Sequence, residues 1–205
     1  MALDGHDMQM KPAILPDLMV LTTAVMPKMT ALYERARAAL RAEFLVDGKI
    51  SSAKIEANQT AAHSLAWLAT YVEALRQMQA WAEKLTETGT FGEMEQLIHQ
   101  IAFGEYISQI YGGIPMNQGE MARLCDLGLG LVQPSHPEAS KLMLEGNTVE
   151  ARTRLVELMQ DNAGHATFGK TGLDDDLEMI REQFRRFSDD RVVPHAHDWH
   201  LNDEL

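Results

Sequence analysis

Three histidines near the end of the chain are the residues whose type and spacing most suggest metal chemistry. His195, His197 and His200 stand with Asp198 in one short segment. Imidazole and carboxylate ligands suit zinc and similar ions. His197 and His200 share a helical face only if a helix continues beyond Pro194, and His195 then points elsewhere. We therefore expect no metal site here, because metal ligands have to converge in space.

Two short runs of aspartates, at 174–176 and 189–190, offer acid–base chemistry or a divalent cation site as an alternative. The first run stands at the start of a predicted helix, where acids face the positive end of the helix dipole. Nothing apolar surrounds these acids in sequence to raise a carboxyl pKa. We interpret them as capping and solubilising residues, with Asp174 or Thr171 as the cap and Glu178–Arg181 as a helical ion pair.

Cys125 is the single cysteine of the chain, so an internal disulfide is excluded. A lone thiol suits a reducing compartment. Cys125 stands in an apolar stretch between Leu124 and Leu127, without a histidine nearby in sequence. We expect a buried structural thiol rather than a nucleophile, and we assign no catalytic residue.

Gln109, Gly112 and Gly113 form a Gln-x-x-Gly-Gly segment at the end of a predicted helix. Two glycines after a helix permit a left-handed cap and a close approach of another chain or a ligand to the backbone. As a bare pattern, the segment is typical of a helix end.

The segments that would position these residues show helical periodicity almost throughout. We expect helices over residues 27–46, 51–87, 91–111, 118–129, 138–144 and 147–161, and a last helix that begins near 174. Pro27 is expected at the first helical position, and Asn147 is expected to cap the helix that follows it. Helix 51–87 carries two adjacent apolar stripes, which predict packing on two neighbours. The predicted fold class is an all-α antiparallel helical bundle.

The most specific family pattern lies at the end of the chain. It rests on Leu173, Glu178, Met179, Ile180, Arg181, Arg185, Arg186, Phe187, Pro194, His195, Ala196 and Trp199. This segment resembles the opening helix of the flavin-dependent acyl-CoA dehydrogenases. The resemblance accounts for the segment from Pro194 to Ala196 without a metal, and it implies that the chain stops where such an enzyme would begin.

The Gln-x-x-Gly-Gly segment is similar to a motif in the C-terminal helical domain of the same family, near the adenosine-diphosphate part of FAD bound by the partner subunit. The resemblance implies Gln109, Gly112 and Gly113 as cofactor-binding residues. The chain departs from the family after the glycines. Ile114 to Glu120 stands where the family has a further glycine, an aromatic residue and an Arg-Asp pair, and the segment with the catalytic base is missing.

Together these resemblances predict three parts. Residues 1–161 form a helical N-terminal extension, a bundle that resembles a degenerate acyl-CoA dehydrogenase C-terminal domain. Residues 162–172, which are rich in glycine and small polar residues, form a linker. Residues 173–205 form the truncated start of the dehydrogenase N-terminal helical domain.

The implied function is that of a fragment of an FAD-dependent acyl-CoA dehydrogenase, a CH–CH oxidoreductase acting on a short branched or dicarboxylic acyl-CoA. In the family, a glutamate removes the α-proton and the β-hydride passes to the flavin. Neither that base nor the flavin-holding β-domain is found, so we expect the chain alone to be inactive and not to bind FAD firmly. For the full enzyme, the resemblance implies an acyl-CoA as substrate, an electron-transfer flavoprotein as partner, and assembly into a homo-oligomer.

The composition of the chain indicates which partners and which cellular location to expect. A net charge of -12 argues against nucleic acid and anionic membrane surfaces. The first residues lack the basic charge of an export signal, and the longest uncharged run, residues 57–72, is too short and too polar for a membrane span. We expect a cytoplasmic protein.

Two other interpretations stay open. The chain could be a non-catalytic helical module for assembly or interaction, which shields a dimer interface or covers an active-site entrance. It could also be an unrelated all-α domain whose last helix resembles the dehydrogenases by chance.

Overall fold

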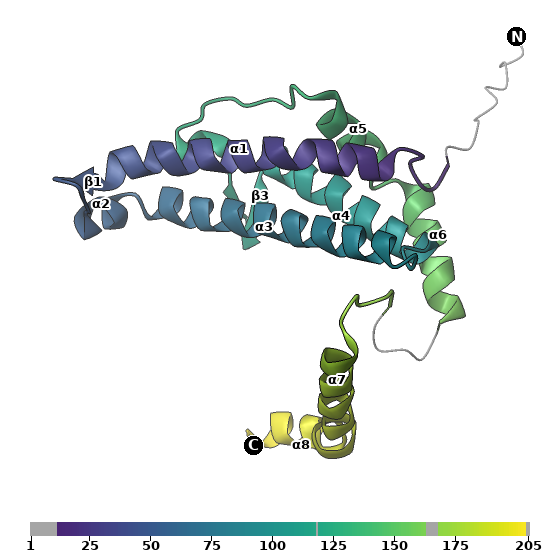
Figure 1. Ribbon diagram of the computed structural model, residues 1–205. Helices are drawn as coiled ribbons and strands as arrows, with labels where there is room; N and C mark the ends of the chain where they lie inside the picture. Colours follow the sequence, from purple (N-terminus) through teal and green to yellow (C-terminus); the bar gives the residue numbers. More distant parts are fainter. Residues whose placement is uncertain (1–11, 118, 163–167, 204–205) are drawn as a thin grey trace, which may run out of the picture. The chain divides into compact units, whose positions relative to one another are not determined.

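The computed structural model describes residues 12–117, 119–162 and 168–203. The chain divides into two compact units, Met1–Lys170 and Thr171–Leu205, which are described separately. Helices dominate both units (Figure 1), so the predicted all-α fold class is confirmed. Within the described ranges, no helix combines the length and the apolar composition needed to cross a membrane.

The first helix, α1 (Leu18–Phe44), begins well before Pro27, so the predicted start at Pro27 is wrong. Pro27 lies inside the helix, where it removes one backbone hydrogen bond at a cost of about 3 kcal/mol. Val25 and Met29 flank it and are fully buried. Burial of each such side chain contributes about 1.5–3 kcal/mol, which offsets the cost of the proline.

A tight hairpin follows, formed by β1 (Leu45–Val46) and β2 (Lys49–Ile50). Its turn is the predicted Asp47-Gly48 pair, and both residues have positive φ. The predicted helix 51–87 is then two helices, α2 (Ser52–Ala57) and α3 (Gln59–Glu87). The break falls at Asn58, whose side-chain amide donates to the carbonyl of Lys54 at 3.0 Å. Such local side-chain bonding competes with continued helix formation.

Helix α3 packs on both α1 and α4 (Glu93–Gly112), which confirms the prediction of two neighbours. In Figure 1, α1 and α3 lie side by side along their length, with α4 behind them. One stripe of α3, which includes Leu68, Val72 and Leu75, is buried. The stripe beside it, which includes Trp67, Tyr71 and Trp81, is half-buried. The largest side chains of the core include Phe103, Ile107 and Ile110 of α4.

A second hairpin stands where a helix was predicted over residues 118–129. Its strands are β3 (Ile114–Asn117) and β4 (Glu120–Ala122), and a short 3-10 helix, Leu124–Leu127, follows them. Ile114 pairs with Ala122 across the hairpin, and both are buried. The helix-forming residues of this segment misled the prediction, because tertiary packing overrides a weak local preference.

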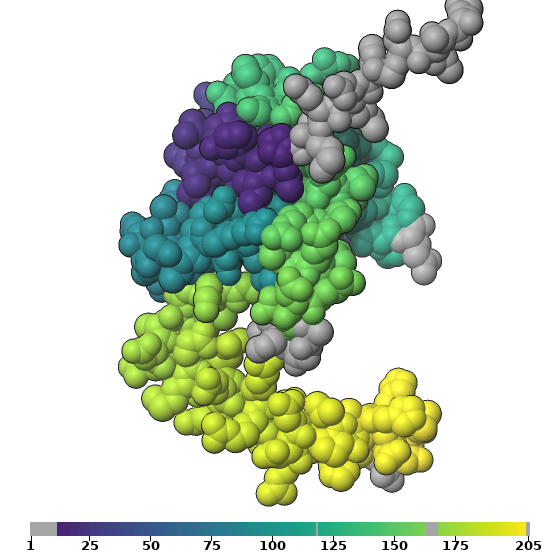
Figure 2. All heavy atoms as spheres, turned by 90° about the vertical axis from the view of Figure 1, so that its right-hand side faces the viewer, coloured from purple at the N-terminus to yellow at the C-terminus, as the bar shows by residue number. Residues whose placement is uncertain are grey.

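Two further helices complete the first unit: α5 (Pro137–Glu145) and α6 (Val149–Asp161). Helix α6 covers one end of the bundle (Figures 1 and 2). Its cap is Thr148, whose hydroxyl accepts from the backbone N–H of Ala151 at 3.2 Å, so the predicted cap at Asn147 is wrong. Of the predicted linker, residues 163–167 lie outside the described residues.

The second unit consists of α7 (Asp175–Phe187), a π-helical turn (Ser188–Val192) and α8 (Val193–Asn202). The predicted cap is confirmed, because the carboxylate of Asp174 accepts from the N–H of Leu177 at 2.9 Å. None of the described residues of α7 or α8 is buried.

Candidate functional site

Gln109 lies in the last turns of α4 with both ends of its side-chain amide engaged inside the bundle. Its Oε1 accepts a hydrogen bond from the hydroxyl of Tyr71 on α3 at 2.6 Å. Its Nε2 donates to Oε1 of Glu105 at 2.5 Å. The ring of Tyr71 stacks on Tyr106, with centroids 4.5 Å apart. Burial, with added contributions from Tyr106 and Glu105, raises the pKa of Tyr71, so its hydroxyl stays protonated and able to donate.

Glu105 extends this polar contact to a third part of the bundle. Its Oε2 accepts from the side-chain amide of Asn147 at 2.6 Å. Asn147 immediately precedes Thr148, the cap of α6. Tyr71, Gln109, Glu105 and Asn147 therefore form one hydrogen-bonded chain that links α3, α4 and the start of α6. We call these four residues the polar strut.

The two glycines differ in their surroundings. Gly113 is buried and has φ of +123°, a backbone conformation that strongly favours glycine. A Cβ there would lie 2.8 Å from the terminal methyl group of Met121, and the N–H of Gly113 donates to the carbonyl of Gln109 at 2.7 Å. Gly112 has open space around its Cα. Gly113 thus allows the chain to turn sharply from the end of α4 into β3.

The three residues predicted to bind a cofactor differ in their surroundings, and their assignment to the flavin stays a prediction. The amide of Gln109 accepts one hydrogen bond from Tyr71 and donates one to Glu105, and a side chain at Gly113 would meet Met121. Gly112 alone offers free space to a ligand. Gln109 and Gly113 thus make contacts within the bundle.

The histidine cluster lies on α8, which does continue beyond Pro194. The ring of His195 lies 5.5 Å from that of Trp199 and is tilted against it by 32°. Within the described residues, no group of three His, Cys, Asp or Glu side chains converges as metal ligands would.

The acids around the start of α7 serve local structure. Glu178 accepts hydrogen bonds from the hydroxyl of Thr171 and from Arg181, the latter at 2.7 Å. The Thr171 bond first, and then the Arg181 bond, lower the pKa of Glu178. The predicted Glu178–Arg181 pair is confirmed. These contacts hold the first turns of α7.

Cys125 is exposed, so the expected buried thiol is wrong. It lies in the 3-10 helix Leu124–Leu127, which buries its two terminal leucines and turns the thiol outward beside Asp126. The apolar neighbours misled the prediction, because in this short 3-10 turn Leu124 and Leu127 are buried while Cys125 between them is exposed.

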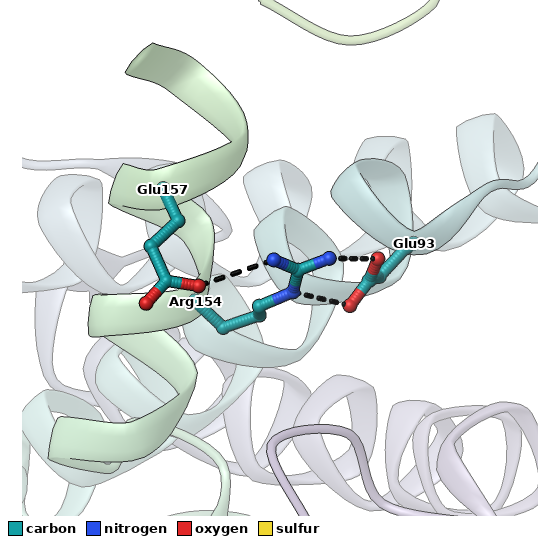
Figure 3. A network of polar contacts seen from close by, with 3 residues as sticks. All are labelled: Glu93, Arg154 and Glu157. Carbon is teal, nitrogen blue, oxygen red and sulfur yellow. Dashed lines mark hydrogen bonds and ion pairs between the residues drawn. The ribbon is translucent and has the colours of Figure 1, made fainter. Parts of the chain in front are cut away.

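One cluster of charged side chains was not predicted from the sequence. Figure 3 shows Arg154 of α6 between Glu93 at the start of α4 and Glu157. The guanidinium donates to both carboxylate oxygens of Glu93, at 2.7 and 2.8 Å, and to Glu157 at 3.1 Å. The bond from Arg154 lowers the pKa of Glu93. The cluster fixes α6 on α4, and its half-exposed partners suit a surface contact rather than a catalytic one.

A buried histidine was also missed. His99 of α4 is fully buried, with Nε2 3.2 Å from the hydroxyl of Thr22 on α1. The rings of Phe91 and Phe103 lie against it, at centroid distances of 5.8 and 4.6 Å. Burial lowers the pKa of His99 to about 4, and a backbone contact with Met78 opposes that shift only in part. His99 is a neutral core residue at physiological pH.

No protein-family model matches the chain, but comparison with known proteins finds sequence similarity to an acyl-CoA dehydrogenase. The chain is 58% identical over 192 residues to a (2S)-methylsuccinyl-CoA dehydrogenase of Cereibacter sphaeroides. The match covers 94% of this chain and 35% of that protein, so the chain spans about a third of its relative's length.

The family resemblance seen in the sequence is thereby confirmed. The long helical segment ahead of the terminal motif predicts 2-methylsuccinyl-CoA dehydrogenase as the most similar member of that family. The relative carries that name.

Proposed function

We propose that the chain forms a helical part of an FAD-dependent acyl-CoA dehydrogenase. The proposed reaction is α,β-oxidation of a short branched or dicarboxylic acyl-CoA such as 2-methylsuccinyl-CoA. The observation that carries this proposal is the 58% identity to (2S)-methylsuccinyl-CoA dehydrogenase across 94% of the chain. Residues 1–161 would be an extension, 162–172 a linker and 173–205 the start of the dehydrogenase domain. The whole enzyme would use an electron-transfer flavoprotein as acceptor and act in the cytoplasm.

We further propose that the 205-residue chain has no dehydrogenase activity by itself. This proposal is supported by the share of the relative that the chain spans, 35%, so most of the residues that hold flavin and substrate would lie in the rest of the enzyme. Flavin in such an enzyme supplies the hydride acceptor, and its binding groups would come from other residues.

The test compares this chain with the full-length relative. Both are incubated with FAD, separated by gel filtration, and assayed for turnover of 2-methylsuccinyl-CoA with an artificial electron acceptor. We expect bound flavin and turnover in the relative, and neither in the chain. Retained flavin in the chain would contradict the expectation that the chain alone does not bind FAD firmly. Turnover by the chain would overturn the proposal of an inactive part.

A second candidate function, an assembly module, is favoured by the second unit. Leu177, Ile180, Phe184 and Phe187 recur at helical spacing on α7, and their exposed fractions range from 47% to 71%. A helical face this apolar is usually covered by another surface. We propose that it packs against the remainder of the enzyme or within a homo-oligomer. Sedimentation should show self-association of the chain, and a Phe184→Glu variant should reduce it.

A further inference from the structure

Residues 168–170 lie on the bundle, although they fall inside the linker that the sequence predicts over residues 162–172. The N–H of Lys170 donates to Oε1 of Glu95 at 2.7 Å, and the carbonyl of Lys170 accepts from Nε1 of Trp81 at 2.8 Å. These contacts all belong to the first unit, which extends to Lys170. We call residues 168–170 the strap. Its backbone is bound by side chains of α4 and α3 that stand 75 and 89 residues away in the chain.

Glu95 is available to the strap because a common partner of such a glutamate is engaged elsewhere. Glu95 is the third residue of α4, where a glutamate often accepts from the N–H of the cap residue. That cap residue is Gly92, and its N–H donates to the carbonyl of Thr90 at 2.9 Å instead. Glu95 is only 7% exposed, and a buried carboxylate needs a donor to replace its lost hydration. The N–H of Lys170 is such a donor.

The indole of Trp81 is held in place from the opposite side. Its ring meets the ring of Phe91 edge-on, with centroids 6.2 Å apart. An indole N–H can only donate, so it matches the carbonyl of Lys170. Trp67 on the same helix donates to Nε2 of His63 at 2.9 Å, a contact that stays within α3. Of these two tryptophans, Trp81 is the one that binds a segment remote in sequence.

Gly169 allows the strap to lie close to α4. Its φ is +80°, a backbone conformation that favours glycine. A Cβ there would lie 3.3 Å from Cδ1 of Ile98 and 3.6 Å from Oε1 of Glu95. A larger residue would therefore push the strap away from the acceptor that binds it.

The strap does not pack continuously on the bundle. A cavity of about 430 Å³ lies beside it, and Leu158 of α6 and Phe168 of the strap are among the residues that line the cavity. Within the described residues, the strap is held by two hydrogen bonds to its backbone and by the close approach of Gly169. So few contacts can open locally at a much lower cost than unfolding of the bundle.

We propose that the strap is a conformational device that sets the length of the tether between the two units. When it is docked on Trp81 and Glu95, residues 171–174 remain between the bundle and α7, and they span at most about 14 Å. When it is released, residues 162–174 remain between α6 and α7, and they span at most about 45 Å. Because effective concentration depends on linker length, docking limits the volume that the second unit can search.

In the full enzyme, this role rests on the proposed function, because only there does the second unit begin the dehydrogenase domain. Docking of the strap is a property of the 205-residue chain and involves neither flavin nor acyl-CoA. The experiments below therefore fail or succeed independently of the test of the proposed function.

The first test is limited proteolysis of the full chain with trypsin, followed by mass spectrometry. Trypsin cleaves after Lys170 only when the backbone there is free to enter the protease, so docking protects this bond. Trp81→Phe removes one hydrogen bond and should speed cleavage after Lys170 by roughly 2–10-fold. Glu95→Leu removes the charged acceptor and should speed it by roughly tenfold or more. Gly169→Ala changes the strap alone and should act in the same direction.

The controls keep the hydrogen-bonding groups or remove them elsewhere. Glu95→Gln retains an acceptor oxygen, and Trp67→Phe removes an indole donor from the same helix that does not bind the strap. Both should keep the cleavage rate near that of the unchanged chain, and urea denaturation checks that the bundle of each variant is folded. Equal rates in Glu95→Leu and Glu95→Gln, or in Trp81→Phe and Trp67→Phe, would overturn the proposal.

The second test measures the tether itself. Spin labels are attached to Cys125, which is exposed, and to a second site introduced by Asp198→Cys in α8. Double electron–electron resonance then gives the distribution of distances between the two units. This distribution should broaden in Trp81→Phe and Glu95→Leu and stay unchanged in Trp67→Phe. If cleavage after Lys170 accelerates while the distribution stays the same, the strap does not set the tether and the proposal is wrong.

Discussion

Gly104 of α4 and Gly146 at the end of α5 approach each other so closely that neither position has room for a side chain. A Cβ on Gly146 would lie 3.0 Å from the Cα of Gly104 and 2.5 Å from the carbonyl oxygen of Leu142. A Cβ on Gly104 would lie 2.8 Å from the backbone nitrogen of Asn147. The neighbours are backbone atoms, which cannot move aside as a flexible side chain can. This contact sets the distance between α4 and the α5–α6 connection.

Gly104→Ala should therefore destabilise the bundle although alanine is the better helix former. Replacing glycine by alanine in a helix raises the helix propensity by about 1 kcal/mol. The added methyl group clashes with backbone atoms, which costs about 1–3 kcal/mol, and more where the clash pushes the helices apart and weakens their packing. We expect a net loss of about 1–2 kcal/mol in the free energy of unfolding, measured by urea denaturation.

Gly112→Ala is the matched control, because Gly112 ends the same helix and a Cβ there would meet nothing within 4 Å. It should leave the stability unchanged or raise it slightly. If both alanine variants shift the urea midpoint equally, the close contact of Gly104 and Gly146 does not determine the effect.

The polar strut leads to a second prediction. Tyr71→Phe removes one hydrogen bond and should cost about 1 kcal/mol. Gln109→Leu leaves the Tyr71 hydroxyl and one oxygen of Glu105 without their partner, so it should cost about 1–3 kcal/mol. The double variant should cost less than the sum of the two single ones, since both remove the same bond. Strict additivity in thermal unfolding would show that Tyr71 and Gln109 do not interact.

The local part of the fold was open to prediction from sequence. The stripes of α3, the Asp47-Gly48 turn and the Asp174 cap follow from spacing and side-chain type within a few residues. The start of α1 was missed because a proline usually marks a first turn, whereas here burial on both sides of Pro27 outweighs its cost.

The candidate site was less predictable because its contacts are distant in sequence. The motif glycines identified Gln109 correctly as a residue at a helix end, but its partner Tyr71 stands 38 residues earlier on another helix. Likewise, Arg154 meets Glu93 across 61 residues. Such pairs depend on helix packing angles, which a periodic pattern does not determine.

Gln100 provides a third prediction, because its side chain joins three segments. Its Oε1 accepts from the N–H of Leu15 at 2.7 Å, and its Nε2 donates to the carbonyls of Ala13 and Gly146 at 2.9 and 3.1 Å. Gln100→Leu leaves these buried groups unpaired and should cost roughly 3 kcal/mol or more. Gln96→Leu, on the same helix one turn earlier, loses one bond to Phe91 and should cost less. Chemical denaturation measures the free energy of unfolding of both variants. Equal losses of stability would contradict the inference that Gln100 holds three segments together.

His99 makes the stability of the bundle depend on pH. Its pKa is about 4 in the fold, against about 6.5 in an unfolded chain. The unfolded state therefore binds the proton first, so the contribution of neutral His99 is fully present above pH 6.5 and is lost as the pH falls towards 4. The shift corresponds to about 3 kcal/mol across that window. His99→Gln removes the titrating group, and its unfolding free energy should fall less between pH 7.5 and 4.5 than that of the unchanged chain. His63→Gln, at an exposed position, should keep the full pH dependence. If all three proteins lose stability in parallel, acid unfolding starts at other groups and His99 is not the residue that titrates.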